Sequence, residues 1–369
     1  MSASKLSFHQ IVEHFAPGWF AAVMGTGVLS IALFAFRQSI PFAGAVQPVL
    51  LWLSVLLFVV LLVPWLARWI QHPQAVRRDL QHPVSAAFFP TMPISLLVLG
   101  IALEKNPPSF LSESALWSTL LVLWVAGAAG ILFFALSILN IFFHQPELKW
   151  ESATFGWLIP PVSTLLIPVL GFSLAGHYAA SAWGTFTLFA SLMFTGVGTL
   201  LFLFVMGTVF TRYVFYALPP VQLAPTLMVG VAPTSILTII VLRLVKPAQA
   251  VLAFSPQVAE TLNTLTAITA VALWGFALFW LILAVIITLG IHRKTPLPFA
   301  LSWWAFIFPL GAFAVASGAL YQAAPFGFFL WSGLLVLAGV MVMWLVTLSR
   351  TLHGAWQGTL FVPHNAPQK

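Results

Sequence analysis

Side chains that could support nucleophilic, acid–base or metal chemistry are few in this sequence, and none is expected inside its long apolar stretches. The chain has no cysteine, which excludes disulfides and thiolate chemistry. All nine histidines fall in predicted loops or tails, and no HExxH or Walker A pattern occurs. The sequence therefore predicts no enzyme, no metal site and no cofactor, with an integral membrane enzyme as a remote alternative.

The acidic residues also fall in predicted loops or in the amino-terminal lead. They are Glu13, Asp79, Glu104, Glu113, Glu147, Glu151 and Glu260. Cation carriers and proton pumps usually place Asp or Glu near the middle of the membrane. A cation pathway is therefore disfavoured, and a small anion is the expected cargo. Positive helix ends, backbone N–H groups and hydroxyls can hold an anion without a buried full charge.

Hydroxyl side chains are the polar groups that the apolar stretches do contain. Those in the first, third, fifth, seventh and ninth stretches are Thr26, Ser30, Ser85, Thr91, Ser95, Ser163, Thr164, Thr234, Ser235 and Ser317. They could form a weak anion path, and a weak site suits fast passage. The alternative is that each hydroxyl donates to a backbone carbonyl left free by a nearby proline.

The composition indicates an all-α polytopic membrane protein. Of 369 residues, 61% are hydrophobic and only 6% are charged, which a soluble fold could not keep away from water. The basic residues are scattered singly, so we expect no nucleic-acid partner. Ten stretches approach the length of about 20 residues that a bilayer requires. They are Gly18–Phe36, Val46–Ile70, Val84–Leu103, Ala115–Phe143, Phe155–Leu174, Ala182–Phe210, Ala224–Leu244, Leu262–Ile291, Ala300–Tyr321 and Phe326–Leu348.

The loops are short, so we expect one ten-helix transmembrane domain at 17–350, a lead segment at 1–16 and a tail at 351–369. We expect no cleaved signal peptide. With the amino terminus in the cytoplasm, ten Lys and Arg residues lie inside and four outside. The positive-inside rule therefore predicts a multi-pass protein of the plasma or inner membrane with both termini cytoplasmic.

Prolines concentrate in the odd-numbered stretches. This alternation predicts five helical hairpins, with Pro-kinked odd helices around a central pore and straight even helices outside, because irregular backbone is tolerated where it lines a cavity. The alternative is that prolines are simply common in transmembrane helices. The predicted pore-lining residues are Gly25, Thr26, Gly27, Pro90, Pro93, Pro160, Ser163, Pro233, Thr234 and Pro309.

The ninth stretch combines an uncharged, aromatic sequence with a proline near its middle. It contains Phe306, Phe308, Pro309 and Phe313. A bent aromatic helix of this kind suits the wall and gate of a narrow pore. The alternative is one more packed helix, since the chain has 34 phenylalanines.

Three segments resemble a known family. Residues 14–27, HFAPGWFAAVMGTG, resemble the opening of the first helix in the tellurite-resistance/dicarboxylate transporter family. The run WWAFIFP at 303–309 is similar to the ninth-helix signature of that family. The run LSRTL at 348–352 is similar to the carboxy-terminal end of the family's sequence. The seventh stretch departs from the pattern, because VAPTS at 231–235 replaces a glycine-rich turn.

The resemblance implies ten helices in five hairpins around a pore, in a homotrimer with one pore per subunit in the lipid bilayer. It also implies a phenylalanine plug on the ninth helix. By its place beside the proline that residue is Phe308, with Phe306 and Phe313 as alternatives, and Gly25 would lie where the first helix bends. The family includes tellurite-resistance channels, sulfite efflux pumps, malate permeases and slow anion channels.

Two cargoes remain open. A negative cell interior drives a monovalent anion outward by about 2.3 kcal/mol per 100 mV, so a passive pore would export sulfite-like or other small inorganic anions. Uptake of malate or another C4-dicarboxylate would need proton coupling. No carboxylate is expected within the membrane, and this favours the passive anion channel over the proton-coupled transporter.

Overall fold

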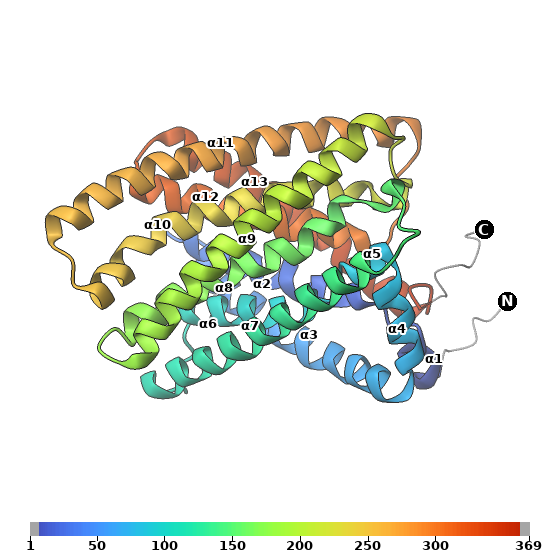
Figure 1. Cartoon of the computed structure of the whole chain (residues 1–369), viewed down its shortest axis with the longest axis horizontal. Coiled ribbons are helices and arrows are strands. Elements are labelled where there is room, and N and C mark those ends of the chain that lie inside the picture. The colour runs from blue at the N-terminus through green and yellow to red at the C-terminus, as the bar shows by residue number, and fades with distance from the viewer. Residues whose placement is uncertain (1–6, 362–369) are drawn as a thin grey trace.

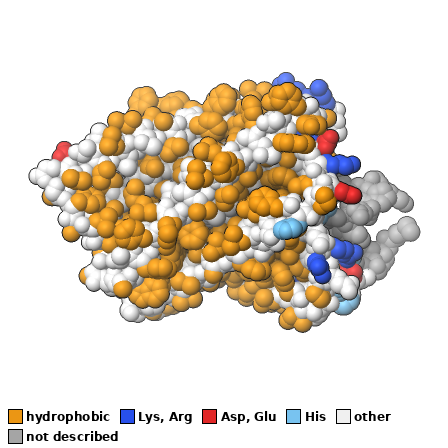
Figure 2. All heavy atoms as spheres, viewed as in Figure 1, with side chains coloured by type: hydrophobic (Ala, Val, Ile, Leu, Met, Phe, Trp, Pro, Cys, Tyr) orange, Lys and Arg blue, Asp and Glu red, His pale blue; other side chains and the backbone are white. Residues whose placement is uncertain are grey.

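The computed structural model describes residues 7–361, and every regular element in that range is a helix. Ten segments are long and apolar enough to cross a bilayer, which confirms the prediction of an all-α protein with ten spans. Figure 1 shows the long helices running along the long axis of the molecule. In this view apolar side chains cover most of the surface, and charged side chains gather mainly at the end that carries the described chain ends (Figure 2).

The spans combine α-helices with short 3₁₀ segments. The α-helices are α1 (Phe8–Glu13), α2 (Ala21–Ala35), α3 (Ala43–Gln71), α4 (Pro73–Gln81), α5 (Pro83–Ala86), α6 (Thr91–Lys105), α7 (Glu113–Phe143), α8 (Ile159–His177), α9 (Ala182–Phe215), α10 (Ala232–Leu252), α11 (Pro256–Lys294), α12 (Ile307–Ala323) and α13 (Gly327–Trp356). The 3₁₀ segments are η1 (Pro17–Phe20), η2 (Trp150–Ser152), η3 (Phe155–Leu158), η4 (Val221–Val231) and η5 (Leu301–Phe306). Helix α13 thus continues past residue 350, where the sequence placed the end of the domain.

The ten spans fall into two classes by burial. In the odd-numbered spans, which contain α2, α6, α8, α10 and α12, between 72 and 89% of the most apolar segment is buried. In the even-numbered spans, α3, α7, α9, α11 and α13, the share is 22 to 39%. We call the two sets the inner and the outer helices. The outer helices present the apolar side chains that a bilayer solvates.

The inner helices form a closed ring. Helix α2 packs against α6, α6 against α8, α8 against α10, α10 against α12, and α12 returns to α2. Each inner helix also packs closely against the outer helix that follows it in the chain. Short connections explain this pairing, because consecutive antiparallel helices are close in space when the loop between them is short.

The inner spans begin as 3₁₀ or turn segments, and most of their prolines lie where the α-helix starts. Pro309 is in the first turn of α12, Pro233 in that of α10, and Pro160 in that of α8. A proline costs little there, because the first backbone N–H groups of a helix have no helical partner. The predicted mid-helix kinks are thus not confirmed at these positions. Pro168 does lie inside α8, but α3, an outer helix, also contains two prolines.

Tryptophan side chains connect the two layers. The indole N–H of Trp124 on α7 donates to the carbonyl of Ile167 on α8 at 2.9 Å. Trp280 on α11 donates likewise to Leu227 in η4 at 3.1 Å. Two further bonds, Trp344 to Thr26 and Trp274 to Ser317, reach hydroxyls of α2 and α12 at 3.0 and 2.8 Å. These outer-helix donors therefore satisfy polar groups of the inner ring away from water.

Helices α8 and α9 approach closely at one glycine, which generates a test of the packing. A Cβ atom on Gly198 would lie 2.6 Å from Thr164 Oγ1 and 2.7 Å from Leu165 Cδ2, whereas one on Gly196 would meet nothing within 4 Å. We therefore expect Gly198→Ala to destabilise the protein by about 1–3 kcal/mol through overpacking.

The matched control is Gly196→Ala, which faces outward on the same helix and should not lower stability, because alanine favours the helix more than glycine does. Thermal unfolding of both variants in detergent measures the difference. Equal melting temperatures for the two variants would contradict the close α8–α9 contact.

Candidate functional site

The candidate site is a cavity enclosed by the inner ring. Its volume is about 430 Å³, and all five inner helices contribute to its lining. The lining residues are Val28, Ile31, Phe34, Ala35, Val98, Ile101, Lys105, Leu166, Val169, Ile236, Ile239, Leu242, Arg243, Phe308, Ala312, Val315, Ala319, Gln322 and Ala323. On α12 they extend from the first turn to the last residue, which corresponds to a rise of about 22 Å. The cavity therefore runs lengthwise between the inner helices.

A second hollow of about 530 Å³ lies on the outside of the molecule. It is lined mainly by α11, including Glu260 and Asn263, with Gln249 of α10 and Ala323 of α12. It involves only two of the five inner helices, and α11 is an outer helix. A path across the bilayer must be surrounded by protein, so we take the cavity in the ring as the functional candidate.

Of the three candidate gate residues, only Phe308 lines the cavity. Phe308 is 6% exposed and belongs to the first turn of α12, where the lining on that helix starts. Phe313 instead stacks on Trp274 of outer helix α11, with ring centroids 5.3 Å apart. Phe306 is buried and packs edge-on against Trp303 at 5.9 Å. The three phenylalanines thus have different surroundings, although they lie within eight residues of one another.

The ten residues predicted to line a pore lie elsewhere on the inner spans. None of Gly25, Thr26, Gly27, Pro90, Pro93, Pro160, Ser163, Pro233, Thr234 and Pro309 is among the residues that line this cavity. Most belong to the starts of α6, α8, α10 and α12, whereas the cavity on α6, α8 and α10 occupies later turns. Gly25 lies against Trp304, since a Cβ atom there would be 2.8 Å from the indole ring.

Most of the predicted hydroxyls are occupied by backbone carbonyls. Thr26 donates to Ala22 O at 2.8 Å and Ser317 to Phe313 O at 2.8 Å. The same holds for Ser30, Thr91, Ser95, Ser163, Thr164 and Ser235. Among the described residues, the buried hydroxyl of Thr234 has no hydrogen-bond partner. The wall of the cavity is apolar, because none of these hydroxyl residues is among those that line it.

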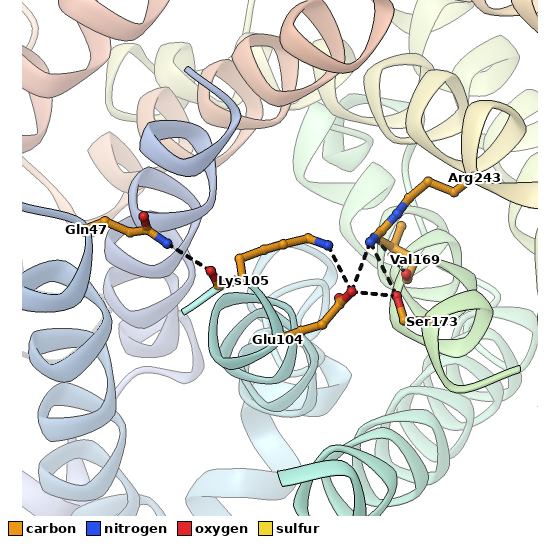
Figure 3. A network of polar contacts seen from close by, with 6 residues as sticks. All are labelled: Gln47, Glu104, Lys105, Val169, Ser173 and Arg243. Atoms are coloured by element: carbon orange, nitrogen blue, oxygen red, sulfur yellow. Dashed lines mark hydrogen bonds and ion pairs between the residues drawn. The ribbon is translucent and has the colours of Figure 1, made fainter. Parts of the chain in front are cut away.

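Charged side chains gather where α6 ends. Lys105 and Arg243 both line the cavity. Lys105 Nζ lies 2.8 Å and Arg243 Nη2 3.3 Å from Glu104 Oε1, and Ser173 Oγ donates to the same oxygen at 3.0 Å. Figure 3 shows the three helices α6, α8 and α10 joined through this carboxylate. We call Glu104, Lys105, Ser173 and Arg243 the mouth cluster.

The mouth cluster corrects one sequence-based expectation. Glu104 was assigned to a loop, but α6 continues to Lys105 and the side chain of Glu104 is only 13% exposed. Arg243 is held further by the bond from its Nη1 to Val169 O at 3.0 Å, and Gln47 Nε2 fixes the end of α6 through Lys105 O at 3.4 Å. The sequence did contain one signal for this cluster. Glu104 and Arg243 fall at the same end of two odd-numbered spans, the third and the seventh.

A third cation lies near the mouth. The guanidinium of Arg37 is 3.9 Å from the ring centroid of Phe34, and Lys105 Nζ is 5.8 Å from the same centroid. Phe34 itself lines the cavity. Three cations against the single carboxylate of Glu104 give this end of the cavity an excess of positive charge. Such an excess attracts anions and repels cations.

Comparison with known proteins also points to the transport of anions. Residues 14–352 match the model of the SLAC1 family, described as voltage-dependent anion channel. An uncharacterized transporter of Methanocaldococcus jannaschii is 32% identical over 96% of this chain and 97% of its own length. A sulfite efflux pump of Arthroderma benhamiae is 23% identical over 95% of this chain and 93% of its own.

A malic acid transport protein of Schizosaccharomyces pombe is 22% identical over 84% of this chain and 71% of its own length. These relatives include both cargo classes, sulfite and malate, that the sequence left open. The resemblance seen in the first and ninth spans is confirmed, and the family is one of membrane transporters and channels rather than enzymes. The chain belongs to the SLAC1 family of voltage-dependent anion channels.

Proposed function

We propose that the chain is a passive pore for small anions, in which the path runs through the cavity of the inner ring and Phe308 is the gate. Three features of one cavity together support this proposal. The cavity is apolar and lies between five helices, cations line one end of it, and the Phe308 ring lies where the lining residues on α12 begin. A ring that fills a narrow apolar neck blocks an ion sterically and by excluding water.

The residues at the starts of the inner helices would then line the other half of the path. They include Pro160, Pro233 and Pro309, and their neighbouring backbone N–H groups belong to the first turns of α8, α10 and α12. The first N–H groups of a helix and its dipole both favour negative charge. Phe308 would therefore separate a half with helix amino termini from a half with side-chain cations.

We further propose that both described ends of the chain face the cytoplasm of a plasma or inner membrane, and that the protein forms a homotrimer. The excess of Lys and Arg at one end supports the orientation. The chain has no cysteine, so a single cysteine introduced at Gln357 can be labelled with an impermeant maleimide. Labelling of the Gln357→Cys variant in intact cells would contradict the cytoplasmic orientation. Chemical cross-linking of the protein in membranes tests the homotrimer separately.

If Phe308 is the gate, removal of its ring should open the path. We expect Phe308→Ala to raise anion flux at least about tenfold, which corresponds to a barrier lower by about 1.4 kcal/mol. Flux is measured in liposomes with the membrane potential clamped by valinomycin and potassium.

Phe313→Ala is the matched control, because the Phe313 ring packs on Trp274 and does not line the cavity. Its flux should not rise. A folded Phe308→Ala protein with wild-type flux would eliminate Phe308 as the gate.

The passive mechanism predicts how the flux responds to driving forces. Because a monovalent anion gains about 2.3 kcal/mol per 100 mV on leaving a negative interior, efflux of chloride should follow the clamped voltage and ignore a pH gradient, and efflux of sulfite should also follow the voltage. Parallel assays with sulfite, chloride and malate give the order of permeation. Malate flux that requires a pH gradient, with no flux of the inorganic anions, would instead indicate a proton-coupled dicarboxylate transporter.

A further inference from the structure

The mouth cluster has more donors than acceptors. An ammonium group carries three N–H donors and a guanidinium five. Lys105 donates to Glu104, and Arg243 contacts Val169 O, Glu104 Oε1 and Ser173 Oγ. Three of these side chains share the one oxygen Glu104 Oε1, and Glu104 Oε2 is buried without a partner in the described part of the chain. The two cations therefore retain donor capacity.

The remaining donors of the two cations are available on the cavity side. Lys105 and Arg243 line the cavity, with side chains 23% and 24% exposed, whereas Glu104 does not line it. The carboxylate contacts both cations (Figure 3), but only the cations line the cavity. A guanidinium and an ammonium on one wall can donate together to an ion with several oxygens.

We propose that Lys105 and Arg243 form a binding site for a small oxyanion or carboxylate at the mouth of the cavity. Glu104 is a positioning residue of this site. It holds the two cations against the wall and, as a tethered carboxylate, competes with the mobile anion for their charge. This inference rests on the proposed function, because it assigns the site to the anion path.

The presence of Glu104 then has a physical reason. Two cations beside an apolar cavity, without a counter-charge, would bind an anion tightly and hold it there, and a conducting path requires a site that releases its ion. They would also repel one another. One shared carboxylate reduces both effects and still leaves an excess of positive charge, to which Arg37 adds at the rim. Glu104 thereby sets the affinity of the mouth.

The chemistry also gives a preference among anions. Arginine recognises planar or branched oxyanions by two parallel hydrogen bonds, which a spherical halide cannot accept. Sulfite or a carboxylate should therefore bind at the mouth more tightly than chloride.

The test measures binding separately from transport. Purified protein in detergent is dialysed to equilibrium against radiolabelled sulfite, with unlabelled malate and chloride as competitors. Glu104→Gln keeps an oxygen that can accept from Lys105 and Ser173 but removes the competing charge, so sulfite should bind about tenfold more tightly. Arg243→Gln should bind about tenfold more weakly, and Arg243→Lys should recover most of the affinity. Lys105→Gln provides a second loss-of-charge variant should Arg243→Gln not fold.

Lys246→Gln is the matched control, because Lys246 is an exposed cation on the same helix that does not line the cavity. Its sulfite affinity should equal that of the wild type. The proposal is overturned if the wild type shows no saturable sulfite binding, if both loss-of-charge variants bind as the wild type does, or if Glu104→Gln weakens binding.

Flux of the same variants in liposomes separates this inference from the proposed function. Binding that changes as expected in a protein without anion flux would support the mouth site and contradict the pore. Voltage-driven flux with unchanged binding in all variants would support the pore and overturn the mouth site.

Discussion

Inside a bilayer, a backbone polar group must find its partner within the protein, and the division into inner and outer helices depends on this constraint. The inner spans contain most of the prolines and the 3₁₀ entry segments, and so they contain many of the carbonyls and N–H groups without regular helical partners. Indole N–H groups from the outer helices donate to backbone carbonyls of the inner spans, as Trp124 does to Ile167, and hydroxyls of the inner helices also donate to backbone carbonyls. The outer helices then present apolar side chains to lipid.

The same constraint explains why the cavity is apolar. The hydroxyls of the inner helices already donate to carbonyls, so Val, Ile, Leu and Ala side chains form most of the wall. Polar recognition is confined to the end where Lys105 and Arg243 meet Glu104. With both described chain ends in the cytoplasm, as proposed, an anion that leaves the cell would pass the ring of Phe308 first, then the apolar passage, and would meet the cations last. Such an order confines polar recognition to the exit, without a tight site in the passage.

The sequence predicted the fold better than the site. Span number and inner–outer alternation followed from long apolar stretches and from the uneven use of proline, both of which are local signals. The cavity-lining residues carry no such signal, since Ile236 or Val169 looks like any residue of an apolar helix until the ring closes around it. Phe308 could be distinguished from Phe306 and Phe313 only by its place beside Pro309 and by family resemblance.

Two errors have a common physical origin. The sequence predicts Pro309 near the middle of a helix because a 3₁₀ segment and an α-helix have the same apolar composition, and the sequence does not mark where one becomes the other. The sequence predicts Glu104 in a loop because a carboxylate is costly in an apolar span. Its cost is offset by Lys105 beside it and by Arg243, which is distant in sequence. A pairing of this kind appears only in three dimensions.

The claim that anions pass through the inner ring is tested most directly by a single cysteine at Ala319, which lines the cavity, in a chain that has no native cysteine. Anion flux in liposomes is followed before and after reaction with a bulky, negatively charged thiol reagent. The account predicts that modification of Ala319→Cys blocks the flux, while modification of Gln357→Cys, exposed just past the end of α13, leaves it unchanged. Full modification of Ala319→Cys with undiminished flux would contradict the account and place the anion path outside the ring.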